Sequence, residues 1–86
     1  MPPDTYDFRV ALNSLFKAAE AKGAPYVDVN SGDLHRRVGM YPGRNHRMPI
    51  CCEVMKANMG PGDLILNQPP KGKGASLTIR YMLPRS

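Results

Sequence analysis

The chain lacks several features that would place it among membrane or secreted proteins. Its 86 residues include no tryptophan, only two cysteines and only two histidines. No stretch approaches the roughly 18 consecutive apolar residues that a membrane-spanning helix needs. The first ten residues, MPPDTYDFRV, lack the charged-then-apolar layout of a signal peptide. We therefore expect a cytoplasmic protein without membrane association.

The scarcity of cysteine and histidine also limits metal chemistry. A metal site would need all four of these side chains, and their spacing matches none of the paired patterns that hold a tetrahedral zinc ion. The four candidates are His35, His46, Cys51 and Cys52. Adjacent cysteines form a strained ring when oxidised, so reduced thiols are expected, one in the core and one on a partly covered helix flank. His35 is expected at the surface. The sequence predicts no metal and no cofactor.

Enzyme activity is also not expected. A cysteine nucleophile beside a histidine would be the simplest arrangement. A chain of this length, however, forms one small core that buries roughly 60–65% of its unfolded surface, which leaves little material for a substrate cleft of ordinary volume. A metal-using nuclease would want nearby acids, and residues 34–52 contain none. We expect a single non-enzymatic domain over residues 1–86, with no small-molecule substrate.

Charge is distributed unevenly along the chain. Residues 1–35 contain three Lys or Arg against five Asp or Glu, whereas residues 36–86 contain nine against two. The net charge of +5 therefore originates entirely in the second half. Such an imbalance is typical of a domain that turns one face to a polyanion, although a solvated basic surface produces it as well.

Hydrophobic spacing predicts a long first helix. Apolar residues recur at i, i+3, i+4, i+7, i+8 and i+11, which forms one stripe on a helix. Asp4 or Thr5 can cap its start, and Gly23 followed by Pro25 ends it. The apolar stripe consists of Phe8, Ala11, Leu12, Leu15, Phe16 and Ala19.

Two shorter elements and a long connection follow. Residues 26–29, YVDV, alternate as a short strand does. Asn30 or Ser31 can cap a second helix over residues 32–38, which Gly39 ends. Residues 39–48, GMYPGRNHRM, are longer than the usual link between two helices and are therefore a candidate functional loop.

The last part of the chain predicts a helix and a hairpin. Pro49 suits the first position of a third helix over residues 49–59. Residues 63–67 and 77–83 predict two strands, the second with clear period-two alternation. Between them, QPPKGKGA is too rich in proline and glycine to pair and should project as a tip. The buried face of the third helix is expected to contain Cys51, Val54, Met55 and Met59.

This order of elements resembles a winged helix-turn-helix domain, from Asp4 to Leu83. The resemblance implies an α+β fold of three helices closed by a small antiparallel sheet, with residues 32–38 as supporting helix, 49–59 as recognition helix and 69–74 as wing. The family's turn between these helices is usually three or four residues. Here residues 39–48 intervene, so either the third helix begins earlier, near Asn45, or the loop itself reaches the nucleic acid.

The resemblance implies a protein that binds duplex DNA, as a regulator or as an accessory subunit of a DNA-processing system. The main contacts are expected from the 39–48 loop and the start of the third helix, where Arg44 and Arg47 can bridge guanine and Asn45 can pair with adenine. His46 is expected to contact phosphate or stabilise the turn. The remaining candidates are phosphate contacts that position the protein, namely Arg36, Arg37, Lys56, Lys71, Lys73 and Arg80.

Two alternatives stay open at this point. The arginines, Arg36 and Arg80 in particular, can instead pair with Asp28, Asp33 or Glu53. The domain as a whole can instead be a protein-interaction module without nucleic-acid binding, which forms a homodimer or docks a protein partner through the first helix or the wing. Methionines near the third helix would suit an adaptable interface, although they equally fill cores.

Overall fold

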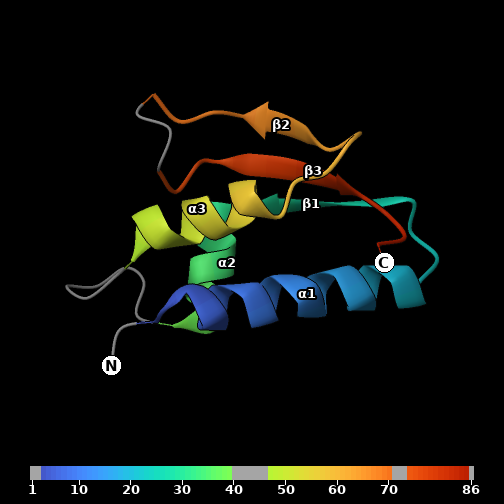
Figure 1. The fold of residues 1–86 in the computed structure, drawn as a ribbon, viewed down its shortest axis with the longest axis horizontal. Helices are drawn as coiled ribbons and strands as arrows, with labels where there is room; N and C mark the ends of the chain where they lie inside the picture. The colour runs from blue at the N-terminus through green and yellow to red at the C-terminus, as the bar shows by residue number, and fades with distance from the viewer. Residues whose placement is uncertain (1–2, 40–46, 71–73, 86) are drawn as a thin grey trace.

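The computed structural model describes residues 3–39, 47–70 and 74–85. Three helices pack against one face of a three-stranded antiparallel sheet (Figure 1). The α+β class and the order of elements predicted from the sequence are confirmed. The elements are α1 (Thr5–Ala21), β1 (Tyr26–Asn30), α2 (Ser31–Val38), α3 (Met48–Ala57), β2 (Leu64–Asn67) and β3 (Thr78–Met82). No helix within the described ranges is long and apolar enough to cross a bilayer.

The first two helices begin and end where their caps predict. The Asp4 carboxylate accepts from the Asp7 amide and the Asp7 carboxylate accepts from the Asp4 amide, each at 3.0 Å, which forms a capping box. The Asn30 side chain accepts from the Asp33 amide at 3.0 Å at the start of α2. Gly39, with φ of 115°, ends α2 in a conformation that favours glycine.

Helix α3 is buried on more than one side. It begins at Met48 with Arg47 as N-cap, so the earlier start near Asn45 is wrong. Because it packs on α1 and α2 and also accepts, through the Met55 carbonyl, a 2.7 Å hydrogen bond from the Tyr81 hydroxyl, it has little free flank. Cys52 is therefore fully buried like Cys51, and the expectation of a partly covered thiol is wrong.

The last strand lies in the middle of the sheet. β3 pairs antiparallel with β1 on one side and with β2 on the other. Ile79 and Tyr81 point into the core, whereas Arg80 lies on the outer face, as strand alternation requires. β2 is an edge strand whose pairing is irregular between Ile65 and Asn67, and all of its residues are exposed.

The start of α2 is joined to the chain that leads into β3. The Ser31 hydroxyl donates to the Gly74 carbonyl at 2.6 Å, and the Gly32 amide donates to the Ala75 carbonyl at 3.1 Å. A Cβ on Gly32 would lie 3.0 Å from that same carbonyl oxygen and 3.3 Å from the Ala75 Cβ. The two backbones can therefore approach this closely only because residue 32 has no side chain.

The variant Gly32→Ala tests this close approach. The added methyl group must displace the Ala75 carbonyl, which should lower the free energy of unfolding by about 1–2 kcal/mol. Gly60→Ala is the matched control, because its Cβ would meet nothing closer than 3.8 Å. Urea denaturation should separate the two variants, and equal stabilities would contradict the tight contact.

A second junction, formed around Arg85, closes the other end of the molecule. The Arg85 guanidinium contacts the Asp63 carboxylate at 3.0 Å and donates to the Asn58 carbonyl at 2.7 Å, while its backbone amide donates to Glu20 at 2.7 Å. The same guanidinium lies over the Phe16 ring, 4.9 Å from the centroid. Arg85 thereby joins the ends of α1 and α3 to the start of β2.

Asp63 is held in its charged form at this junction. Burial alone raises the pKa of its carboxyl, but hydrogen bonds from the Met82 and Gly60 amides and from Arg85 outweigh burial, so the net pKa lies below the usual value. A carboxyl whose pKa is lower in the folded chain stabilises the fold above its unfolded value of about 3.9, and this contribution is lost as the pH falls below that value.

Asp63→Asn should therefore lower the free energy of unfolding at pH 7 by about 1–3 kcal/mol. The difference in free energy of unfolding between this variant and the wild type should shrink as the pH falls toward about 2, because the wild-type carboxyl is then protonated. Asp33→Asn is the control, since Asp33 is 76% exposed and forms only a surface pair. Chemical denaturation across this pH range measures both, and a deficit that does not change with pH would contradict the charged role of Asp63.

Candidate nucleic-acid interface

The end of α2 and the start of α3 meet at the ring of His35. This side chain is fully buried, so its expected surface position is wrong. Its Nε2 accepts from the Arg47 amide at 2.8 Å, its Nδ1 lies 3.1 Å from the Gly39 carbonyl, and its ring contacts the edge of Phe8 with centroids 4.9 Å apart. Burial is tolerated because both ring nitrogens have backbone partners.

The partners of His35 define its protonation. A backbone N–H can only donate, so Nε2 must be unprotonated to accept from Arg47. The Gly39 carbonyl can only accept, so Nδ1 must carry the proton. The buried ring is therefore a neutral imidazole in one defined tautomer.

Three of the predicted basic residues come from this corner of the molecule. Arg36 and Arg37 follow His35 in the last turn of α2, and Arg47 is the N-cap residue of α3; all three are exposed. The Arg36 guanidinium donates to Asp33 at 3.0 Å, a pair that the sequence left open as an alternative. Arg44, Asn45 and His46 belong to residues 40–46, which lie outside the described part of the chain.

The predicted wing adjoins the same end of the molecule. Lys71 and Lys73 lie outside the described residues, but Gly74, which follows them, is bonded to the first residue of α2 and to Cys52 of α3. Its carbonyl accepts from the Ser31 hydroxyl at 2.6 Å and from the Cys52 thiol at 3.4 Å. The described chain on either side of residues 40–46 and 71–73 thus gathers at one end, on the left of Figure 1.

The start of α3 is electrostatically different from the starts of the other helices. α1 and α2 each carry an aspartate in the first turn, Asp7 and Asp33 respectively. α3 has no acidic residue in its first turn and no side-chain cap, and its N-cap is Arg47. A helix N-terminus carries a partial positive charge. At the start of α3 no acidic side chain of the first turn offsets this charge, and the cationic side chain of Arg47 adds to it.

Two other predicted contacts are engaged within the protein. Arg80 forms a two-pronged pair with Asp28 at 2.8 and 3.1 Å and lies 4.0 Å from the centroid of the Tyr26 ring. Its hydrogen bonds lower the pKa of the Asp28 carboxyl, outweighing burial, which raises it. Arg80 therefore lies on the outer sheet face and not with the helix starts. Lys56 is half-buried in the last turn of α3.

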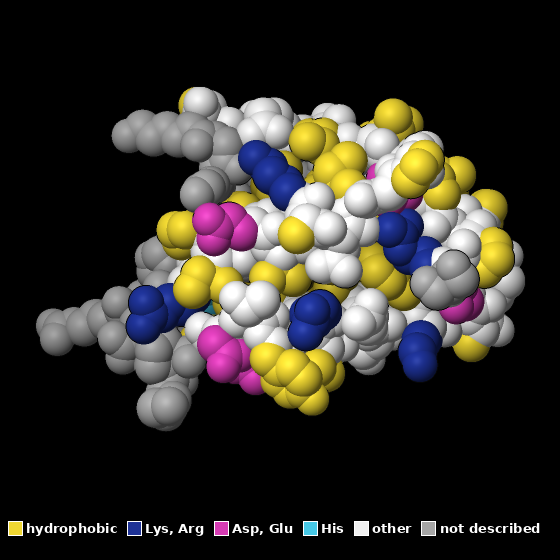
Figure 2. Space-filling model, in the orientation of Figure 1, with side chains coloured by type: hydrophobic (Ala, Val, Ile, Leu, Met, Phe, Trp, Pro, Cys, Tyr) yellow, Lys and Arg dark blue, Asp and Glu magenta, His cyan; other side chains and the backbone are white. Residues whose placement is uncertain are grey.

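The face of the molecule seen in Figure 2, which includes strands as well as helices, shows no continuous basic surface among the described residues. Figure 2 shows Lys and Arg side chains standing apart on this face, with acidic and uncharged side chains between them. A surface of this kind provides no single strip for a polyanion. The end of the molecule near His35 is the better candidate.

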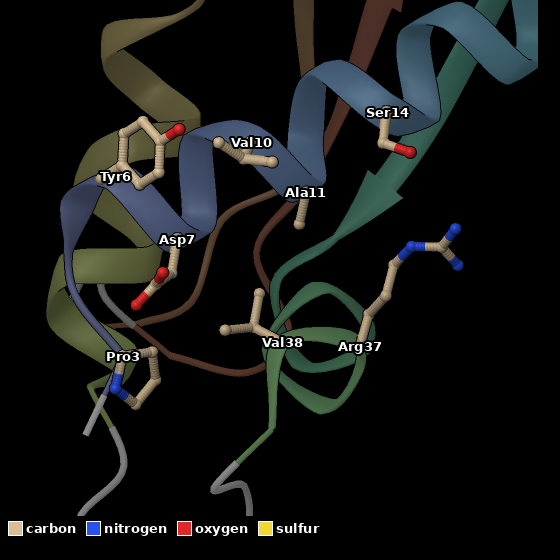
Figure 3. Close-up of a pocket in the computed structure, with 8 residues that line it drawn as sticks. All are labelled: Pro3, Tyr6, Asp7, Val10, Ala11, Ser14, Arg37 and Val38. Atoms are coloured by element: carbon tan, nitrogen blue, oxygen red, sulfur yellow. The ribbon is translucent and has the colours of Figure 1, made fainter. Parts of the chain in front are cut away.

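A groove between α1 and α2 is a separate feature. It measures about 490 Å³, and Figure 3 shows that Tyr6 and Val10 line it from α1 while Arg37 and Val38 line it from α2. Tyr6 is 65% exposed and Val10 49% exposed, so both present apolar surface to the solvent at this groove. Sequence patterns alone give no sign of this groove, because Tyr6 and Val10 fall outside the apolar stripe.

Within the part of the chain that the structure describes, the buried thiols form neither an accessible nucleophile nor a metal site. Burial, with the neighbouring Cys52 thiol, raises the pKa of the Cys51 thiol to about 12. The Cys51 thiol donates to the Ser31 carbonyl at 3.5 Å. Within the described ranges no three His, Cys, Asp or Glu side chains are arranged to hold a metal ion. Both thiols pack the centre of the fold.

The thiols should consequently be protected in the folded protein. At about pH 8 a disulfide reagent should modify both cysteines at least roughly a hundredfold more slowly in buffer than in denaturant, since the core must open first. Absorbance of the released chromophore measures the rate. Rapid modification of either thiol in folded protein would show an accessible thiolate and revive the nucleophilic interpretation.

No family model, curated protein or solved structure matches this chain. Its function must therefore be inferred from the geometry and electrostatics described above.

Proposed function

We propose that this protein is a winged helix domain that binds duplex DNA, as a regulator or as an accessory subunit of a DNA-processing system. The observation that carries the proposal is the start of α3. Arg47 is the N-cap residue of this helix, and the first turn has no acidic side chain. Both a cationic side chain and the positive end of a helix attract phosphate. The arrangement of three helices and a small antiparallel sheet supports the same class.

The contacts divide into two kinds. Arg47, with Arg44 and Asn45 from the preceding segment, would lie against base edges or phosphates near the start of α3. Lys71 and Lys73 of the 69–74 wing would contact the backbone, as would Arg36 and Arg37. Arg80 contributes less, because binding DNA would require it to leave Asp28. The neutral, buried His35 makes no contact with DNA in this arrangement.

Fluorescence anisotropy with random duplex DNA across a salt series tests the proposal. If about four phosphates are engaged, log affinity should fall against log salt with a slope near −3.6. Removing two contacts, in Arg44→Ala/Arg47→Ala or in Lys71→Ala/Lys73→Ala, should reduce that slope to about −1.8 and weaken binding at low salt. Base preference should change only in the first variant.

Lys17→Ala/Lys22→Ala is the matched control. It removes the same charge from the half of α1 that lies at the opposite end of the molecule, both side chains being exposed. Its salt slope should stay close to that of the wild type. If the wild type shows no salt-sensitive binding, or if neither test variant loses affinity relative to this control, the protein does not bind DNA as proposed.

A protein-interaction module is the second candidate, and the groove between α1 and α2 favours it. Exposed Tyr6 and Val10 beside this groove would suit an apolar side chain of a partner. The two candidates differ in the salt series: an interaction module without nucleic-acid binding has no salt-dependent affinity for DNA.

A further inference from the structure

One buried ring fixes both the end of α2 and the start of α3. The Gly39 carbonyl and the Arg47 amide are eight positions apart in the chain, yet both are bonded to the His35 imidazole, at 3.1 and 2.8 Å. The Arg47 amide belongs to the N-cap residue of α3, whose φ and ψ are −124° and 49°. The orientation of this residue therefore depends on an acceptor 12 positions earlier in the chain.

The acceptor exists only while the imidazole is neutral. A proton on Nε2 would convert it into a donor facing another donor, the Arg47 N–H, and would place a charge in a fully buried ring. No other common side chain changes between acceptor and donor so close to neutral pH. A single proton added to the Nε2 of His35 therefore removes the hydrogen bond that positions Arg47.

Charged residues adjoin this ring or its contact residues in the sequence of each neighbouring helix. On α2 they are Arg36 and Arg37, the next two residues, and at the start of α3 the group is Arg47 itself. On α1 the ring packs on Phe8, whose preceding residue Asp7 lines the groove beside Arg37. The Asp7 carboxylate is itself bonded to the Asp4 amide at 3.0 Å, in the capping box of α1.

We propose that His35 is the positioning residue of the DNA interface, and that its neutral form orients Arg47 and the start of α3 for contact with DNA. This inference rests on the function proposed above. It predicts that DNA affinity decreases on acidification. A histidine that itself contacted phosphate would do the opposite, because its protonation adds a cation to the interface.

The first measurement uses the protein without DNA. Ring ¹H–¹⁵N correlations at about pH 8 should show His35 with its proton on Nδ1, and the Arg47 amide should be protected from hydrogen exchange. Protection, corrected for the intrinsic pH dependence of exchange, should fall at least roughly tenfold between about pH 8 and an acidic pH at which the same ring correlations show a proton on both nitrogens of His35. A proton on Nε2 at about pH 8, or equal protection in the singly and doubly protonated protein, would overturn the inference.

The second measurement is DNA affinity at the same two pH values in the His46→Gln protein. This background removes the only other histidine, so that a phosphate contact by His46 does not mask the effect. Affinity should be about fivefold to tenfold lower at the acidic pH, which corresponds to losing one ordering hydrogen bond. Constant affinity, or tighter binding on acidification, would overturn the inference.

Two substitutions at His35 separate positioning from simple loss of structure. His35→Gln retains one donor and one acceptor, so it should bind DNA within about threefold of the wild type at pH 8 but with a flat pH profile. His35→Phe fills the space without an acceptor and should bind about fivefold to tenfold more weakly at both pH values. If His35→Phe does not fold, the flat profile of His35→Gln remains decisive, and a wild-type profile in that variant overturns the inference.

The failure of this inference can be told apart from failure of the proposed function. A wild-type protein that binds no duplex DNA at pH 8 contradicts the proposed function and the positioning role together. The positioning role alone is contradicted if the protein binds DNA with the expected salt slope, but neither the protection of the Arg47 amide nor the DNA affinity changes when His35 is protonated.

Discussion

The fold depends on fixing an eight-residue helix, α2, at both of its ends. A helix of two turns does not persist by itself in water, so its position must come from tertiary bonds. At its start, Ser31 and Gly32 are bonded to the backbone of residues 74–75, and at its end His35 is bonded to Gly39 and Arg47. Since α2 also contacts α1, α3 and β1, these bonds determine how the helices sit on the sheet.

Four arginines of the described chain fall into two pairs with different surroundings. Arg80 and Arg85 are engaged by Asp28 and Asp63 and stack on aromatic rings, so they stabilise the sheet and the far end of the molecule. Arg37 and Arg47 are exposed near the junction of α2 and α3. Part of the formal positive charge of the second half is therefore paired with acidic side chains inside the protein.

Local patterns predicted the elements well, and the long-range contacts poorly. The caps Asp4 and Asn30 and the terminating Gly39 act within one turn, so the sequence shows them directly. His35 was misplaced because its partners are backbone groups, one of them 12 positions away, and backbone groups leave no residue signature. Cys52 was misplaced because helical periodicity assumes one buried face, whereas α3 is covered on several sides. The basic residues of the candidate site were predicted from charge and from the resemblance, and Arg80, which pairs with Asp28, shows the limit of that signal.

The central position of β3 has a consequence for synthesis on the ribosome. Among the strands of the described residues, β1 and β2 each pair only with β3, which is the last of these three to emerge. Until residues 78–82 leave the exit tunnel, neither of the other strands has its partner, and the apolar residues Leu64, Ile65 and Leu66 of β2 have no ladder to join. Helix α1 can form as the chain emerges, but the sheet closes in one late step. A nascent chain stalled before that step would display an unpaired apolar strand, the kind of segment that chaperones bind.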